Sequence, residues 1–142
     1  MKKYLLFVLL AGLVLSACAP QAKSLDGSWT LTAYGPEGAT MPAAAGDQAS
    51  ITFNADGTIS GNSGCNGFGG NYTVDGDQIT FSGILSTLMA CEEPLMSQEI
   101  TTFKVLDGTA SYKIEGETLT ITNNGITLVY TSGGPDSYPS YP

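Results

Sequence analysis

The chain has 142 residues and carries 5 Lys and Arg against 13 Asp and Glu, a formal net charge of −8 at pH 7. Nucleic acids and anionic lipid headgroups bind proteins mainly through Lys and Arg, so this balance argues against both kinds of partner. The chain contains no histidine, which excludes the Ser-His and Cys-His pairs of nucleophilic enzymes.

Residues 1–17 have the features of an export signal. Two lysines precede an apolar run at residues 4–15, which is shorter than the roughly twenty residues of a transmembrane helix. The run ends in Leu-Ser-Ala-Cys at residues 15–18, which resembles the bacterial lipobox, where the cysteine becomes the lipid-bearing first residue of the mature protein. The alternative is ordinary signal cleavage after Ala17. We expect lipid on Cys18.

A lipid on Cys18 would hold the mature protein in the cell envelope, on the outer side of the cytoplasmic membrane. Ala19, rather than an aspartate, follows the cysteine, which looks like an outer-membrane sorting signal in a cell with two membranes. In such a cell we expect the periplasmic face of the outer membrane. Residues 18–26 then form a tether.

Residues 27–131 read as one domain built from short strands. Residues 27–34 alternate, with Trp29 and Leu31 on one face, as in a strand with one buried side. A loop rich in Gly, Pro and Ala follows at residues 35–48. The other predicted strands are 49–54, 58–60, 71–74, 78–81, 84–90, 110–114, 118–121 and 126–130. Segment 84–90 is apolar nearly throughout, which predicts a strand buried on both faces.

One helix is predicted after Glu92-Glu93-Pro94, because proline and carboxylates suit a helix start. Apolar residues then recur at helical spacing and predict a buried stripe. The stripe consists of Met96, Ile100, Phe103 and Leu106. We expect Leu88, Met89, Ile100 and Phe103 to pack against the sheet and not to line an open ligand pocket.

Eight or nine strands and one helix predict a mainly β fold. We expect an antiparallel sheet curled into a small, partly open barrel, with the helix packed against it. Residues 132–142 are rich in Gly, Pro, Ser and Tyr, and are expected to be a disordered tail.

Residues 61–71 hold five glycines and three asparagines around Cys65, which predicts a tightly folded connection rather than a strand or a helix. Once Cys18 carries lipid, Cys65 and Cys91 remain as an even pair in an exported protein, which predicts a disulfide. The alternative is two unrelated buried thiols. The disulfide would leave Asn66 and Phe68 on a rigid surface loop, where we expect a partner contact.

The chain resembles the META domain family, which includes the HslJ-type envelope proteins. The resemblance covers about residues 25–131 and depends on five short motifs. These are Gly-Ser-Trp at 27–29, Gly-Cys-Asn at 64–66, Tyr-Thr-Val at 72–74, Ser-Thr-Leu-Met-Ala-Cys at 86–91 and Leu-Thr-Ile at 119–121. This chain departs from the family at Gly67-Phe68, where a bulky or basic residue is more usual. The resemblance implies a role in envelope stress tolerance, secretion or motility.

The acidic residues form no catalytic pattern. Asp75 with Asp77, and Glu115 with Glu117, flank turn glycines and are expected to face solvent, whereas a general acid needs a carboxyl buried in a cleft. The sequence has neither the ligand spacing of a calcium or zinc site nor the pattern of a phosphate-binding loop. The sequence therefore predicts a protein that is not an enzyme, without metal or cofactor.

Two functions remain open. The first is a monomeric, lipid-anchored envelope protein that binds an unidentified envelope protein and supports envelope integrity or stress tolerance. The second is a carrier that holds an apolar small molecule or lipid inside the half-barrel. A carrier needs an apolar void of several hundred Å3 inside the barrel, whereas in a partner-binding protein large side chains would fill the barrel interior. The side chains expected to fill it are Trp29, Phe53, Phe81, Met89 and Phe103.

Overall fold

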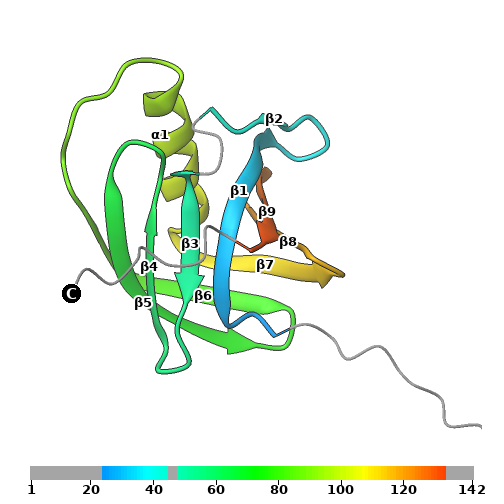
Figure 1. Cartoon of the computed structure of the whole chain (residues 1–142). Coiled ribbons are helices and arrows are strands. Elements are labelled where there is room, and N and C mark those ends of the chain that lie inside the picture. Colours follow the sequence, from blue (N-terminus) through cyan, green and yellow to red (C-terminus); the bar gives the residue numbers. More distant parts are fainter. Residues whose placement is uncertain (1–23, 45–47, 134–142) are drawn as a thin grey trace, which may run out of the picture.

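The computed structural model describes residues 24–44 and 48–133, which form nine strands and one helix (Figure 1). The expected export signal, Cys18 and residues 134–142 of the expected tail lie outside the described residues, whereas Ser132, the first residue of that expected tail, is the last residue of β9. The elements are β1 (Gly27–Pro36), β2 (Met41–Pro42), β3 (Ser50–Phe53), β4 (Thr58–Asn62), β5 (Gly67–Asp75), β6 (Gln78–Ser86), α1 (Leu95–Val105), β7 (Gly108–Glu115), β8 (Thr118–Asn123) and β9 (Ile126–Ser132). Within those two ranges, no helix combines the length and apolar character needed to cross a membrane.

The strands form an antiparallel barrel. Each strand from β3 to β9 pairs with the next, and β1 pairs with β3. β1 also pairs with β9, with Trp29 opposite Ser132, and this pairing closes the barrel. β2 pairs only with β1. The helix packs against β1, β8 and β9 (Figure 1). The predicted mainly β fold with one helix on a barrel is confirmed, and the β1–β9 pairing closes the barrel that the sequence predicted to be partly open.

Large side chains fill the barrel interior. Trp29 anchors one end, where its indole N–H donates a hydrogen bond to the Leu25 carbonyl at 2.8 Å. Each large apolar side chain removed from water contributes about 1.5–3 kcal/mol to folding. The other almost completely buried ones are Leu31, Ile51, Phe53, Ile59, Ile79, Phe81, Leu106, Leu119, Ile121, Leu128 and Tyr130.

The prediction that residues 84–90 form a strand buried on both faces is wrong, because residues 84–86 are the end of β6 and Leu85 is 78% exposed there. The strand ends at Ser86, and the next residues form a loop in which Leu88 is 94% and Met89 58% exposed. Ile100, on α1, is 50% exposed, while Phe103 is partly buried and packs edge-on against Phe68 with ring centroids 5.6 Å apart. Only the packing of Phe103 is therefore as expected, and the expectation that these residues line no open pocket is wrong for Phe103 and Ile100, which line the groove described below.

The buried face of α1 is mostly polar, whereas the sequence predicted an apolar stripe. Of that stripe, Leu106 just after the helix is buried, Met96 and Phe103 are partly buried, and Ile100 is exposed. Gln98, Glu99, Thr102 and Val105 are its buried residues. The physical reason is that α1 faces the turn between β4 and β5, whose backbone groups need hydrogen-bond partners once buried.

The Gly/Asn stretch is also more regular than expected, since β4 continues to Asn62 and β5 begins at Gly67. The connection is a tight turn at residues 63–66. Gly61 lies inside β4, where an added Cβ would come within 2.3 Å of the Ser50 carbonyl oxygen and 2.6 Å of the Phe68 ring. The glycine there is required by close packing.

We predict that Gly61→Ala lowers the free energy of unfolding by about 1–3 kcal/mol, because neighbouring backbone must move. Gly67→Ala is the matched control, since the nearest atom to its added Cβ is 3.8 Å away. The control should be neutral or slightly stabilising. Urea denaturation of the two variants compares them, and equal midpoints would contradict the packing argument.

Candidate functional site

A disulfide links the β4–β5 turn to the loop before α1. Cys65 and Cys91 are bonded, with their Cα atoms 6.0 Å apart, so the predicted pairing is confirmed. The turn itself is held by the Asn62 side chain, whose Oδ1 accepts the Gly64 N–H at 2.7 Å. The turn and the loop therefore form one unit at this end of the barrel.

The expectation that Asn66 and Phe68 lie exposed on a surface loop is wrong: Asn66 is 1% and Phe68 7% exposed. The Asn66 side chain instead fastens the loop after β6. Its Oδ1 accepts the Met89 N–H at 2.7 Å and the Thr87 hydroxyl at 2.8 Å, and its Nδ2 donates to the Met89 carbonyl at 3.0 Å. A primary amide suits this position because it can accept a hydrogen bond from a buried backbone N–H and donate one to a buried backbone C=O.

The Glu99 carboxylate lies behind Asn66 and receives three hydrogen bonds. Oε2 accepts the Ser63 hydroxyl at 2.5 Å and the Asn66 N–H at 3.0 Å, and Oε1 accepts from Asn66 Nδ2 at 3.0 Å. Gln98, which is completely buried, donates from Nε2 to the Ser63 carbonyl at 2.7 Å and accepts the Ala44 N–H at 2.6 Å. We call Ser63, Asn66, Gln98 and Glu99 the polar cluster.

Of the polar cluster, sequence reasoning named only Asn66. Gln98 and Glu99 are adjacent polar residues on a helix, a pattern that normally marks a solvent-facing surface. Their partners lie 33 to 54 residues away along the chain. The one available signal was the i, i+1, i+4 spacing of Gln98, Glu99 and Thr102, and that spacing does not distinguish a buried polar face from an exposed one.

The polar cluster is suited to holding structure together rather than to acid–base chemistry. Both Glu99 oxygens already accept donors, and Ser63 directs its hydroxyl to that carboxylate with no histidine nearby. Across the described ranges, no three Cys, Asp or Glu side chains come together in a way that could hold a metal ion. Asp75, Asp77 and the other turn carboxylates are exposed, as expected.

The groups with a displaced pKa lie elsewhere. Hydrogen bonds from the Thr58 hydroxyl and N–H hold the pKa of the Asp56 carboxyl below its usual value. Burial, and then the Asp26 carboxylate, raise the pKa of Tyr72, and burial raises that of Tyr130. Asp56 lies in the β3–β4 turn, and Tyr72, on β5, donates its hydroxyl to the Asn54 carbonyl of that turn. Both lie at the opposite end of β4 from the polar cluster. These shifts have structural causes and mark no acid–base site.

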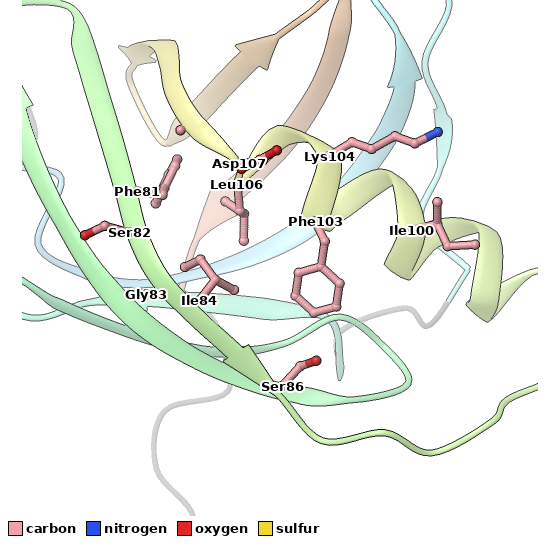
Figure 2. A pocket seen from close by; sticks show the side chains of 11 residues that line it. Phe81, Ser82, Gly83, Ile84, Ser86, Ile100, Phe103, Lys104, Leu106 and Asp107 are labelled. Atoms are coloured by element: carbon pink, nitrogen blue, oxygen red, sulfur yellow. The ribbon is translucent and has the colours of Figure 1, made fainter.

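An open groove with a volume of about 570 Å3 runs between β6 and α1 (Figure 2). Its lining comes from both elements, from Leu106 and Asp107 after α1, and from Gly108 at the start of β7. In Figure 2, Phe103 lies between Ile84 and Ile100, with Ser86 below it. The exposed side chains of Lys104 and Asp107 carry opposite charges beside it. The apolar lining residues are Phe81, Ile84, Ile100, Phe103 and Leu106.

Most of the exposed large apolar side chains lie close together in the sequence, between the end of β6 and the middle of α1. Among the described residues, six large hydrophobic side chains are exposed, and four of them belong to residues 85–100. We call these four, Leu85, Leu88, Met89 and Ile100, the apolar segment. The disulfide and Asn66 fasten the loop that carries two of them.

The fold and site define a class: a small, closed antiparallel β-barrel whose β4–β5 turn is joined by a disulfide to the loop before the helix and by a buried polar cluster to the helix itself. A model of the META domain matches residues 22–133. The chain belongs to the META domain family, as the sequence motifs indicated. The comparison with curated proteins finds no match.

Solved structures show the same architecture. An NMR structure of a protein from Burkholderia xenovorans is 26% identical, covers 75% of this chain and 81% of its own, and has a TM-score of 0.61. A DUF4847 family protein from Bacteroides vulgatus is 15% identical, with 78% and 95% covered and a TM-score of 0.55. A lipocalin-like protein from Bacteroides uniformis is 18% identical, with 75% and 96% covered and a TM-score of 0.52. The last two show likeness of fold alone.

Proposed function

We propose that this META domain protein is a lipid-anchored envelope protein, not an enzyme, that supports envelope integrity or stress tolerance by binding a protein partner. The observation that carries partner binding is the apolar segment. Leu85 and Leu88 are more than three-quarters exposed although the chain around them is fastened. Exposed apolar side chains on an ordered surface are typical of protein interaction sites.

The filled barrel supports partner binding over carriage of an apolar molecule. The positions where a carrier would leave a void hold Trp29, Phe53, Phe81 and Tyr130, all at most 3% exposed. Met89, which was expected inside, lies on the surface instead, and the groove beside β6 opens to solvent. A lipid held in the barrel would therefore have to displace core side chains.

Partner binding can be tested in intact envelopes with a photocrosslinking amino acid at residue 88. We expect a discrete crosslinked protein, because Leu88 is 94% exposed within the apolar segment. The same amino acid at residue 74 is the control, since Val74 is also exposed but lies on the distant part of β5. Absence of any crosslink at residue 88, or equal crosslinking at both positions, would contradict the proposal.

The anchor gives a separate prediction. Cys18→Ala should release the protein from membranes or block its processing, because no acyl chain can then be attached. Fractionation followed by immunoblotting measures this, and Ser24→Ala, in the tether, serves as a control that should fractionate like the parent. An unprocessed precursor or a soluble mature chain both agree with the prediction. A processed variant that still fractionates with membranes would overturn it.

A further inference from the structure

Strand β6 extends beyond its neighbour β7 and leaves one edge open. β5 follows β6 as far as the pair Phe68–Ser86, whereas β7 pairs only with residues 78–81 and ends at the pair Phe81–Gly108. The register of β5 and β6 shifts where Gly83 adopts a φ of +62°. Such a bulge bends a strand and is frequent next to binding sites.

The register shows which backbone groups the open edge presents. Thr87 N–H donates to the Gly67 carbonyl at 3.0 Å, and Leu85 lies opposite Gly69. Because successive residues of an antiparallel strand alternate in direction, the N–H and C=O groups of Ile84 and Ser86 point away from β5. Within the described residues, β7 pairs with β6 only as far as Phe81, so no strand covers this side of residues 82–86.

The groove described above follows this edge. Ile84 and Ser86 line it from the strand, and Phe103 and Ile100 line it from the helix (Figure 2). Its volume of about 570 Å3 is within the range of specific ligand sites, about 300–1,000 Å3. On the other face of β6, Leu85 is 78% exposed. The edge therefore offers hydrogen-bonding groups in its plane and apolar surface on both faces.

We propose that residues 82–86 of β6 receive an extended segment of a protein partner as an added strand. This inference rests on the proposed function and names the chemistry of its partner. Main-chain bonds to Ile84 and Ser86 would give affinity, and side chains entering the groove would give selectivity, as in other strand-addition complexes. Alternate side chains would enter the groove and lie against Leu85, so the segment is apolar on both faces.

Charge favours a segment with a basic flank. The chain has a net charge of −8, Asp107 lies exposed beside the groove, and Glu92 and Glu93 are exposed in the loop that leads into α1. Lys104 is the one cation lining the groove. A lysine or arginine next to the apolar residues would be attracted by the surrounding carboxylates.

A displayed library of random heptapeptides tests the inference on the exported, processed protein. We expect enrichment of apolar peptides with a basic flank, and binding of their synthetic forms should slow hydrogen exchange at the Ile84 and Ser86 amides. Ser86→Pro removes one N–H from the open edge and leaves the bonds to β5, so we expect affinity to fall about tenfold or more. Ser86→Ala keeps the amide and should bind like the parent.

A second pair of variants keeps the test valid if Ser86→Pro fails to fold. Ile100→Lys places a charge in the groove, and Val74→Lys makes the same change at a similarly exposed position outside it. Only the first should weaken binding of the enriched peptides.

Several results would overturn the inference. These are no enrichment, peptides that bind without protecting the two amides, and unchanged affinity in both groove variants. If a fatty acid binds more tightly than the peptides and displaces them, the groove is a lipid site. If the protein forms a dimer that Ser86→Pro disrupts, a second copy of the chain is the occupant of the edge. A crosslink at residue 88 with any of these results would leave the proposed function standing and remove only the strand-addition site.

Discussion

Cys65→Ser is expected to lower the free energy of unfolding by about 3.5 kcal/mol. Cys65 and Cys91 are 26 residues apart in sequence, and closing a loop of that length removes about this much conformational freedom from the unfolded chain. The loss is a large share of the roughly 5–15 kcal/mol that stabilises a domain of this size. Denaturant unfolding of the oxidised parent and the variant measures the difference.

The double variant Cys65→Ser, Cys91→Ser is the control for a newly freed thiol. It should match the single variant, and a reducing agent should destabilise the parent to the same level without affecting either variant. A single variant that unfolds at the parent's denaturant concentration would contradict the prediction. Loss of the disulfide should also reduce peptide binding at β6, because the loop at residues 87–91 begins where the open edge ends.

The strands were predictable because local alternation encodes them. Trp29 and Leu31 alternate with polar residues in β1, and Leu119 and Ile121 do so in β8, so period-2 patterns located both strands. Closure of the barrel was not readable in the same way. It joins β1 to β9, with Leu31 opposite Tyr130, and no local pattern encodes a contact over that sequence distance.

The apolar segment shows a different limit of sequence reading. Residues 84–90 have the composition of a buried strand, yet Leu88 and Met89 lie on the surface. An apolar composition indicates only that the side chains are more stable away from water. Either the protein's own core or the surface of a partner can remove them from water. The disulfide was predictable because the expected export and the cysteine count sufficed, whereas the burial of Asn66 depends on Glu99 across the fold.

Glu99→Ala is expected to lower the free energy of unfolding by about 2–4 kcal/mol. The Asn66 N–H loses its carboxylate partner, the Ser63 hydroxyl loses its shortest hydrogen bond, and a small void forms beside them. Glu99→Gln should cost less, about 1–3 kcal/mol, because the new NH2 group must replace one oxygen that now accepts a donor. Denaturant unfolding at neutral pH measures both variants.

Glu117→Gln is the matched control, since Glu117 is exposed in the β7–β8 turn, and it should change stability by less than about 0.5 kcal/mol. A double-mutant cycle with Asn66→Ala separates the role of the cluster from that of the helix. We expect a coupling of about 0.5–3 kcal/mol, because Asn66 donates to both oxygens of Glu99. Additive effects would mean that Glu99 stabilises α1 independently of the turn. Coupling would make the polar cluster the link that fixes the groove's helical wall to the β4–β5 turn.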